Sequence, residues 1–88
     1  MKNRIFLYEP KAHEQLMEWI KMNPKIASKV LELIDEARLN PFEGKGKPEP
    51  LRHDMKGYWS RRIDQEHRLV YRVTDDEIRI ISCKHHYA

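Results

Sequence analysis

The chain has 88 residues, of which 40% are hydrophobic and 35% charged, and its formal net charge at pH 7 is +3. This length predicts a single domain, residues 1–88, with a small core. The one cysteine excludes an internal disulfide, and the sequence shows neither a membrane-length apolar run nor a signal-peptide pattern, so we expect a cytoplasmic protein with no membrane contact.

The first half of the chain predicts a strand followed by two helices. Residues 4–8 are rich in β-forming side chains and predict a short strand. Pro10 then suits the first turn of a helix, and Asn23 with Pro24 fits the N-cap and first position of a second helix that ends near Pro41. Apolar residues at a spacing of three to four define the buried face of the first helix: Ala12, Leu16, Trp19 and Ile20. We expect the two helices to cover one face of a sheet.

The second half predicts a loop and then a series of strands. Three prolines and two glycines lie in residues 41–50, which predicts a loop leading into a short extended segment. Strands are predicted at residues 58–63, 68–73 and 77–86, and the isoleucine-rich section 78–81 favours a central place for the last one. This order argues for an α+β fold in which two N-terminal helices pack on one face of a small, largely antiparallel sheet.

Alternation along the predicted strands assigns side chains to the two faces of the sheet. Five apolar side chains fall on the helix-covered face: Trp59, Ile63, Leu69, Tyr71 and Val73. Arg62 and Arg68 then point to the open face from neighbouring strands, where two guanidinium groups would form a phosphate clamp. Arg61 falls on the core face by the same count, so we expect it at a sheet edge or beside an acidic partner.

Positive charge is concentrated in the middle of the chain. Residues 44–72 contain eight Lys/Arg against four Asp/Glu, whereas residues 1–43 contain seven of each. Such a distribution is typical of a polyanion-binding surface. Aromatic residues lie among the cations, and Tyr58 and Tyr87 are the better candidates for stacking on bases of single-stranded RNA.

Three residues suggest acid–base chemistry. Glu49 lies between two prolines, which hold its backbone stiffly and make it a candidate general base; the alternative is a solvated loop carboxylate. His86 is a candidate general acid, and the alternative is a frayed terminal histidine. His67 is a weaker candidate, because it precedes Arg68 and so belongs to a turn or points to the opposite face.

A metal centre is not expected from the sequence. His85 and His86 are adjacent on a predicted strand and would point to opposite faces, and the sequence has neither a helical histidine pair nor a second cysteine. A base, an acid and an arginine clamp without a metal fit RNA transesterification. Glu49 would take the 2′-hydroxyl proton, Arg68 and Arg62 would stabilise charge on the phosphoryl oxygens, and His86 would protonate the leaving 5′-oxygen.

Four segments together resemble one known family. Residues 41–51, 57–63, 66–71 and 83–87 are similar to the YoeB/Txe family of bacterial toxins, within the RelE-like superfamily. The resemblance implies a RelE-like fold and the toxin of a type II toxin–antitoxin system. It further implies a metal- and cofactor-independent endoribonuclease that cleaves mRNA in the A site of the 70S ribosome and so inhibits translation. A YefM-type antitoxin is the implied partner.

The resemblance also implies roles for single residues. Glu49, Arg68 and His86 match the family's catalytic residues. Four further residues are expected to bind RNA or its phosphates: Lys47, Arg52, Arg62 and Tyr87. Two alternatives remain open, namely a protein-directed toxin of the same fold, such as a gyrase poison, and a non-catalytic nucleic-acid-binding module. The sequence also leaves the oligomeric state open, a homodimer included.

Overall fold

A computed structural model describes residues 4–52 and 55–85 and gives two helices and five strands within them. In chain order these are β1 (Ile5–Tyr8), α1 (Pro10–Met22), α2 (Pro24–Leu39), β2 (Glu49–Pro50), β3 (Tyr58–Arg62), β4 (Arg68–Val73) and β5 (Glu77–Ser82). The strands form one sheet in the order β1-β5-β4-β3-β2. β1 runs parallel to β5, and every other pair is antiparallel.

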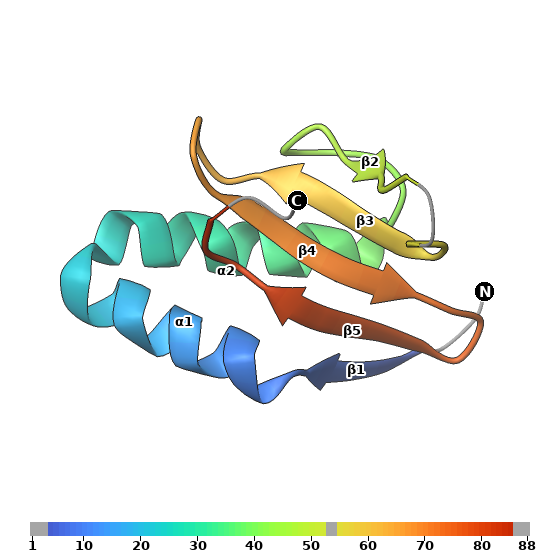
Figure 1. The fold of residues 1–88 in the computed structure, drawn as a ribbon, viewed down its shortest axis with the longest axis horizontal. Helices are drawn as coiled ribbons and strands as arrows, with labels where there is room; N and C mark the ends of the chain where they lie inside the picture. The colour runs from blue at the N-terminus through green and yellow to red at the C-terminus, as the bar shows by residue number, and fades with distance from the viewer. Residues whose placement is uncertain (1–3, 53–54, 86–88) are drawn as a thin grey trace.

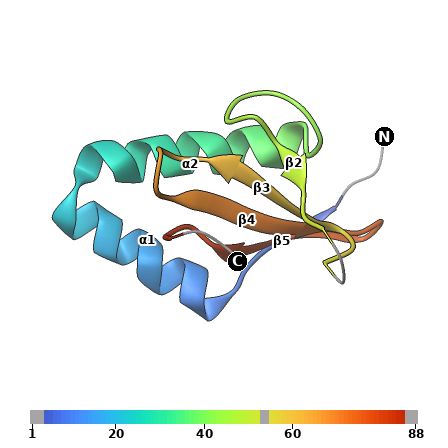
Figure 2. The same cartoon turned by 45° about the horizontal axis from the view of Figure 1, so that its top comes forward.

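Both helices lie on one side of this sheet. Figure 1 shows α2 passing behind β3 and β4, and Figure 2 shows α1 and α2 meeting at one end of the molecule. α1 packs against α2 and β5, and α2 also packs against β4. This arrangement confirms the predicted α+β fold, and β5 does lie inside the sheet, between β1 and β4. Neither described helix has the length and hydrophobicity to cross a membrane.

The helix boundaries follow the predicted capping residues. Asn23 ends α1 by donating its backbone N–H to the carbonyl of Trp19 at 2.8 Å. Its side-chain Oδ1 then accepts from the amide of Ile26 at 3.3 Å and so caps α2. A proline stands in the first turn of each helix, where no intrahelical amide bond is lost.

The buried face of α1 differs from the prediction at two positions. Ile20 is 45% exposed, whereas Gln15 is buried. The reason is a specific hydrogen bond, because Gln15 Oε1 accepts from the amide of Cys83 at 2.7 Å. The helix therefore turns a polar side chain inward between Ala12 and Trp19, which are both buried. Hydrophobic periodicity alone cannot anticipate such a choice.

The last strand is shorter than predicted, because it ends at Ser82. An irregularity in the β4–β5 pairing precedes that end: Tyr71 pairs with Ile80, but Val70 pairs with Ser82. Ile81 is thus an extra residue, which shifts the alternation by one position. Cys83 consequently joins the core on the helix side.

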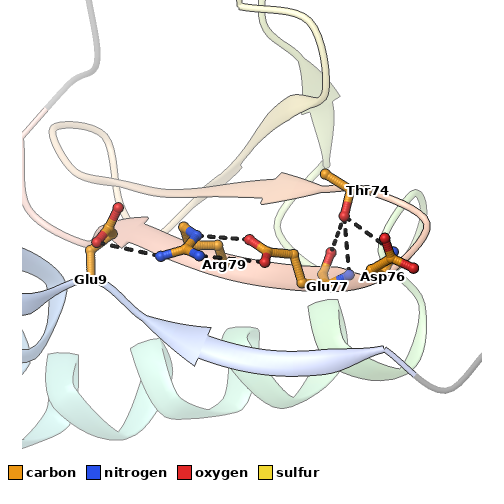
Figure 3. A network of polar contacts seen from close by, with 5 residues as sticks. All are labelled: Glu9, Thr74, Asp76, Glu77 and Arg79. Carbon is orange, nitrogen blue, oxygen red and sulfur yellow. Dashed lines mark hydrogen bonds and ion pairs between the residues drawn. The ribbon is translucent and has the colours of Figure 1, made fainter.

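A polar network fixes the hairpin end of the sheet and the start of α1 (Figure 3). Arg79 Nε donates to Glu77 Oε2 at 2.7 Å, and its Nη1 lies 3.7 Å from Glu9 Oε2. The hydroxyl of Thr74 accepts from the amides of Asp76 and Glu77 at 3.2 and 3.1 Å. The contacts of Thr74 close the turn between β4 and β5. The site described below lies at the opposite end of the sheet.

Candidate functional site

The strand register decides which side chains share the face away from the helices. Trp59 pairs with Tyr71, which belongs to the helix-side core, so the residues beside them face the other way. Ser60 pairs with Val70 on β4 and with Glu49 on β2. Glu49 therefore lies on this second face, here called the open face. Val70 also points there, yet it is fully buried.

Arg62 and Arg68 are direct register partners on the open face. The predicted juxtaposition of these two arginines is thereby confirmed. Within residues 4–52 and 55–85, neither guanidinium has a hydrogen-bond or ion-pair partner. Two adjacent unpaired cations on a sheet repel each other, and an anion bound between them would relieve this repulsion.

A cavity of about 410 Å³ adjoins this arginine pair at the end of the sheet. Its lining residues come from α2, β3, β4 and the turn between those strands: Lys29, Arg62, Ile63, Asp64, Gln65 and Arg68. Lys29 was not singled out in the sequence, because a lysine on a helix carries no local signal of its neighbours. The fold brings it to the arginines and gives the cavity three cations against one carboxylate.

Glu49 reaches the open face from the edge strand β2. Its register partner Ser60 lies two residues before Arg62 on β3, so Glu49 and Arg62 are diagonal neighbours. Such neighbours lie roughly 7–8 Å apart, within reach of a bridging substrate. The carboxylate is exposed, and among the described residues it has no hydrogen-bonding or ionic partner. It is thus available to a proton donor.

Buried Arg61 holds the loop that leads to Glu49. Its side chain is fully buried and bonds to no carboxylate among the described residues. The prediction of a sheet edge or an acidic partner for Arg61 is therefore wrong. Instead the guanidinium donates to the carbonyls of Lys45 at 2.9 Å and Glu43 at 3.1 Å, and to the carbonyl of Asn40. The five donors of arginine match several backbone acceptors at once, which makes a buried cation tolerable without a counter-ion.

Gly46 lets the same loop lie directly on β3. Its carbonyl accepts from the amide of Arg62 at 2.6 Å, and its φ of 84° is unfavourable for other residues. A Cβ there would lie 3.0 Å from Cβ of Arg61 and from Cδ2 of Leu33. Lys47 follows with a φ of 51° and an exposed side chain. The loop thus presents Lys47 beside the strand that carries Glu49.

The remaining predicted residues lie at or beyond the limits of the described chain. Arg52 is exposed just after β2 and has no side-chain partner within residues 4–52 and 55–85. His86 and Tyr87 fall outside the described residues. His85, which precedes them, accepts a hydrogen bond at its carbonyl from the amide of Arg68 at 3.2 Å. The chain therefore passes the backbone of Arg68 immediately before His86.

His67 is the residue whose importance the sequence understated. It lies in the turn before β4, as one of the two predicted possibilities required, and its Nδ1 accepts from the amide of His85 at 2.7 Å. Asp64 shapes this turn by accepting from the amides of Glu66 and His67 at 2.8 and 2.7 Å. Burial opposes ionisation of Asp64, but these hydrogen bonds outweigh it and lower the pKa of the carboxyl.

One group of side chains could in principle hold a metal ion. Glu66, His67 and His85 bring one potential ligand atom each within 4.8 Å of one another. However, Nδ1 of His67 accepts an amide proton, so the neutral ring carries its own proton on Nε2. If a cation bound Nε2, the ring proton would have to sit on Nδ1. It would then face the N–H of His85, which needs Nδ1 as an acceptor. The hydrogen bond and the metal site are therefore incompatible.

Cys83 is unsuited to nucleophilic catalysis. Its side chain is buried among core residues, and burial raises the pKa of the thiol to about 11. The reactive form of cysteine is the thiolate, which is scarce near neutral pH with such a pKa. The carboxylate of Glu49, the two guanidinium groups and the histidines are therefore the groups to consider for chemistry at this site.

Comparison with known proteins identifies similar chains. A family model described as "YoeB-like toxin of bacterial type II toxin-antitoxin system" matches residues 8–87. Toxin YoeB of Escherichia coli K12 is 48% identical over 81 residues, which cover 92% of this chain and 96% of that protein. The solved YoeB dimer from Staphylococcus aureus has a TM-score of 0.85 and 42% identity, and covers 96% of this chain and 98% of its own. The YoeB–YefM complex from the same organism has a TM-score of 0.82 and 43% identity over 97% and 99% of the two chains.

Proposed function

Because this chain belongs to the YoeB-like toxin family of bacterial type II toxin–antitoxin systems, we propose that it is an endoribonuclease that cleaves mRNA in the ribosomal A site and so inhibits translation. The family membership is the one that the sequence motifs predicted. The observation that carries the nuclease proposal is that Arg62 and Arg68 lie side by side on the face that also bears Glu49, and neither has a partner among the described residues. This face combines phosphate-binding cations with a free carboxylate.

The reaction is a metal-independent transesterification within the RNA. Glu49 takes the proton of a ribose 2′-hydroxyl, and that oxygen attacks the adjacent phosphorus. Arg68 and Arg62 stabilise the negative charge that builds on the phosphoryl oxygens. The bond from phosphorus to the 5′-oxygen breaks, and His86 protonates the leaving oxygen. The products are a 2′,3′-cyclic phosphate and a 5′-hydroxyl, and DNA cannot react because it lacks the nucleophile.

Substrate binding uses the cations around this reacting centre. Lys47 and Arg52 flank Glu49 in the sequence and are exposed, so they can bind phosphates on either side of the cleaved bond. Tyr87 stacks on a base, as aromatic residues do in single-stranded RNA recognition. Lys29 adds a further cation in the cavity beside Arg62 and Arg68. The ribosome would hold the message in the extended form that such a shallow site requires.

A YefM-type antitoxin is the proposed protein partner. The related protein of Staphylococcus aureus forms a complex with YefM and also a dimer. Arg62 and Arg68, which have no acidic partner within residues 4–52 and 55–85, suit an acidic segment that folds on binding and competes with RNA for them. We also propose a homodimer for the free toxin.

A cleavage assay on ribosomes stalled with a defined codon in the A site tests the function. The wild-type protein should cleave the message in the presence of EDTA and leave a 5′-hydroxyl. Glu49→Gln should bind the same ribosomes with equal or higher affinity but cleave at least about 10²-fold more slowly, because a general base contributes on that order. A 5′-phosphate product or loss of cleavage in EDTA would contradict the mechanism.

The same assay separates the two alternative functions. A non-catalytic RNA-binding module would bind the ribosomes and leave the message intact. A gyrase-directed toxin would also leave it intact, but would inhibit DNA supercoiling in a purified gyrase reaction. Cleavage by the wild-type protein, combined with unimpaired gyrase activity, distinguishes the proposed function from both.

A further inference from the structure

We propose that His67 is a positioning residue, which fixes the C-terminal segment beside Arg68 through its hydrogen bond with the amide of His85. The proposal rests on the function proposed above, because it is His86, next in the chain, that this segment would present. His67 itself would touch neither the RNA nor the reacting atoms. Its role would be to hold in place the backbone from which the proposed general acid extends.

The bond between these two histidines is short and partly buried. Nδ1 of His67 accepts from the amide of His85 at 2.7 Å, and the side chain of His67 is only 11% exposed. His85 has a φ of 67°, in the left-handed region that residues other than glycine seldom adopt. A backbone in this conformation persists where its surroundings hold it. The hydrogen bond from the amide of His85 to Nδ1 of His67 is one such constraint. The hydrogen bond from the amide of Arg68 to the carbonyl of His85 is another.

The ring of His67 is itself held from three directions. Trp19 meets it edge-on, with the ring centroids 4.8 Å apart and an angle of 85° between the planes. Its backbone amide donates to Asp64 Oδ1 at 2.7 Å, which fixes the turn from which the ring extends. Glu66 Oε1 lies 3.8 Å from Nε2, on the side of the ring that carries the proton. The orientation of Nδ1 toward His85 is thus fixed by its neighbours.

Two side chains of α1 hold the backbone of Cys83, the residue that follows β5. Gln15 accepts from the amide of Cys83 at 2.7 Å, and Trp19 Nε1 donates to the carbonyl of Cys83 at 2.9 Å. β5 has ended at Ser82, so these bonds replace the strand ladder that would otherwise hold this part of the chain. We call Gln15, Trp19 and His67 the tail clamp. The backbone polar groups of Cys83 are held by α1, and those of His85 by the turn and β4.

The clamp connects two proposed catalytic positions through the backbone. The carbonyl of His85 accepts from the amide of Arg68, and the amide of His85 donates to His67, the residue before Arg68. Residues 67, 68 and 85 are therefore joined by two hydrogen bonds, and the next residue is His86. A displacement of about 1 Å in a catalytic group can cost on the order of 10²-fold in rate. A buried residue without substrate contact can thus control the chemical step.

Two substitutions at position 67 separate the hydrogen bond from the packing. His67→Phe keeps a ring against Trp19 but removes the acceptor. His67→Asn removes the ring but keeps an acceptor oxygen close to where Nδ1 lies. We expect His67→Phe to cleave ribosome-bound message on the order of 10²-fold more slowly in single turnover, with ribosome affinity unchanged. His67→Asn should cleave within about tenfold of the wild-type rate. The matched control is His13→Phe, which makes the same change at an exposed histidine of α1 and should alter neither property.

Amide NMR of the free protein supplies a measurement that needs no cleavage. The amide proton of His85 should exchange slowly with solvent in the wild type and in His67→Asn, and rapidly in His67→Phe. Nδ1 of His67 should show no bound proton, because it accepts the amide of His85. If the wild-type protein cleaves no RNA, the proposed function fails. The exchange of this one amide then still decides whether the clamp exists.

Three results would overturn the proposal. In one, His67→Phe frees the His85 amide yet cleaves at the wild-type rate. In another, His67→Asn keeps that amide protected but loses as much activity as His67→Phe, which would assign chemistry to the ring itself. In the third, the amide exchanges rapidly in the wild type. If His67→Phe melts early, Gln15→Met tests the clamp from its other end, and wild-type cleavage by a folded Gln15→Met variant would count against it.

Discussion

Arg61 Nε donates a hydrogen bond to the hydroxyl of Tyr71 at 2.9 Å, and this hydroxyl donates in turn to the carbonyl of Pro41 at 2.7 Å. The two side chains therefore connect β3 and β4 with the loop that follows α2. Burial raises the pKa of Tyr71, although the adjacent guanidinium opposes that rise, so the hydroxyl keeps its proton and can serve as both donor and acceptor. The loop that carries Lys47 is thus hydrogen-bonded to the core by Arg61 and Tyr71.

Arg61→Met should lower the free energy of unfolding by about 3–5 kcal/mol, because it leaves several acceptors without their donor at about 1–3 kcal/mol for each buried one. The hydroxyl of Tyr71 and the carbonyls of Lys45 and Glu43 would lose their donor, and methionine offers none in its place. Urea unfolding measures the effect. Arg72→Met, on the exposed side of β4, is the control and should change stability by less than about 0.5 kcal/mol. Equal stability of the two variants would contradict the structural role of Arg61.

Arg68→Ala should reduce single-turnover cleavage on the order of 10²-fold or more, because it removes charge that acts on the developing phosphorane. Arg68→Lys should restore little of this, since an ammonium group cannot reproduce the bidentate geometry. Neither change should lower the melting temperature much, because the guanidinium has no partner among the described residues. Single-turnover kinetics and thermal melting, measured side by side, test both statements.

Trp59→Ala provides the opposite pattern to Arg68→Ala. Trp59 packs against the core and contacts Phe42, with ring centroids 5.0 Å apart. Its truncation should cost about 3 kcal/mol of stability, as for other large aromatic residues. An early melt for Arg68→Ala, together with a normal melt and weaker RNA binding for Trp59→Ala, would mean that the two faces of the sheet have been exchanged in our assignment.

Lys29→Ala should weaken RNA binding with little effect on stability. Lys29 lines the cavity beside Arg62 and Arg68, so its ammonium can neutralise a phosphate near the cleaved one. For a single strand, losing one phosphate contact should reduce the slope of log K against log salt by about 0.7. A salt titration of RNA affinity measures this slope. Lys25→Ala, one turn earlier on α2, is the matched control, and equal slopes for both variants would remove Lys29 from the binding surface.

Asp64 should make stability depend on pH at the acid end. Its pKa is lowered in the folded state, so its contribution is present above the unfolded pKa of about 3.9 and is lost as the pH falls through the folded value. Asp64→Asn keeps an acceptor oxygen for the amides of Glu66 and His67 but cannot titrate. The wild-type protein should melt higher than this variant near pH 6, and the difference should close below about pH 4. A melting difference that stays constant from neutral pH down to about pH 2.5 would contradict this role.

The sequence alone determined the fold class and the placement of the arginine pair. Prolines and Asn23 defined the helix limits because capping depends on neighbouring residues. Alternation with a period of two assigned Arg62 and Arg68 to one face, because successive side chains in a strand point to opposite faces of the sheet. These are local properties of the backbone, and they transfer from sequence to structure. The catalytic roles of Glu49, Arg68 and His86 stay predictions that the experiments above address.

Only the tertiary structure decided what surrounds the buried polar residues. Arg61 has backbone carbonyls as partners instead of a carboxylate, and Gln15 turns inward to meet an amide 68 residues away. Ile81 is an extra residue near the end of β5, which stops at Ser82. The backbone of Cys83 and His85 is then held by side chains of α1 and by His67. Such contacts join segments far apart in the chain, and a buried polar group takes whichever partner the packing brings within hydrogen-bond distance. No periodicity in the sequence encodes that choice, because it is made only when the helices and the sheet come together.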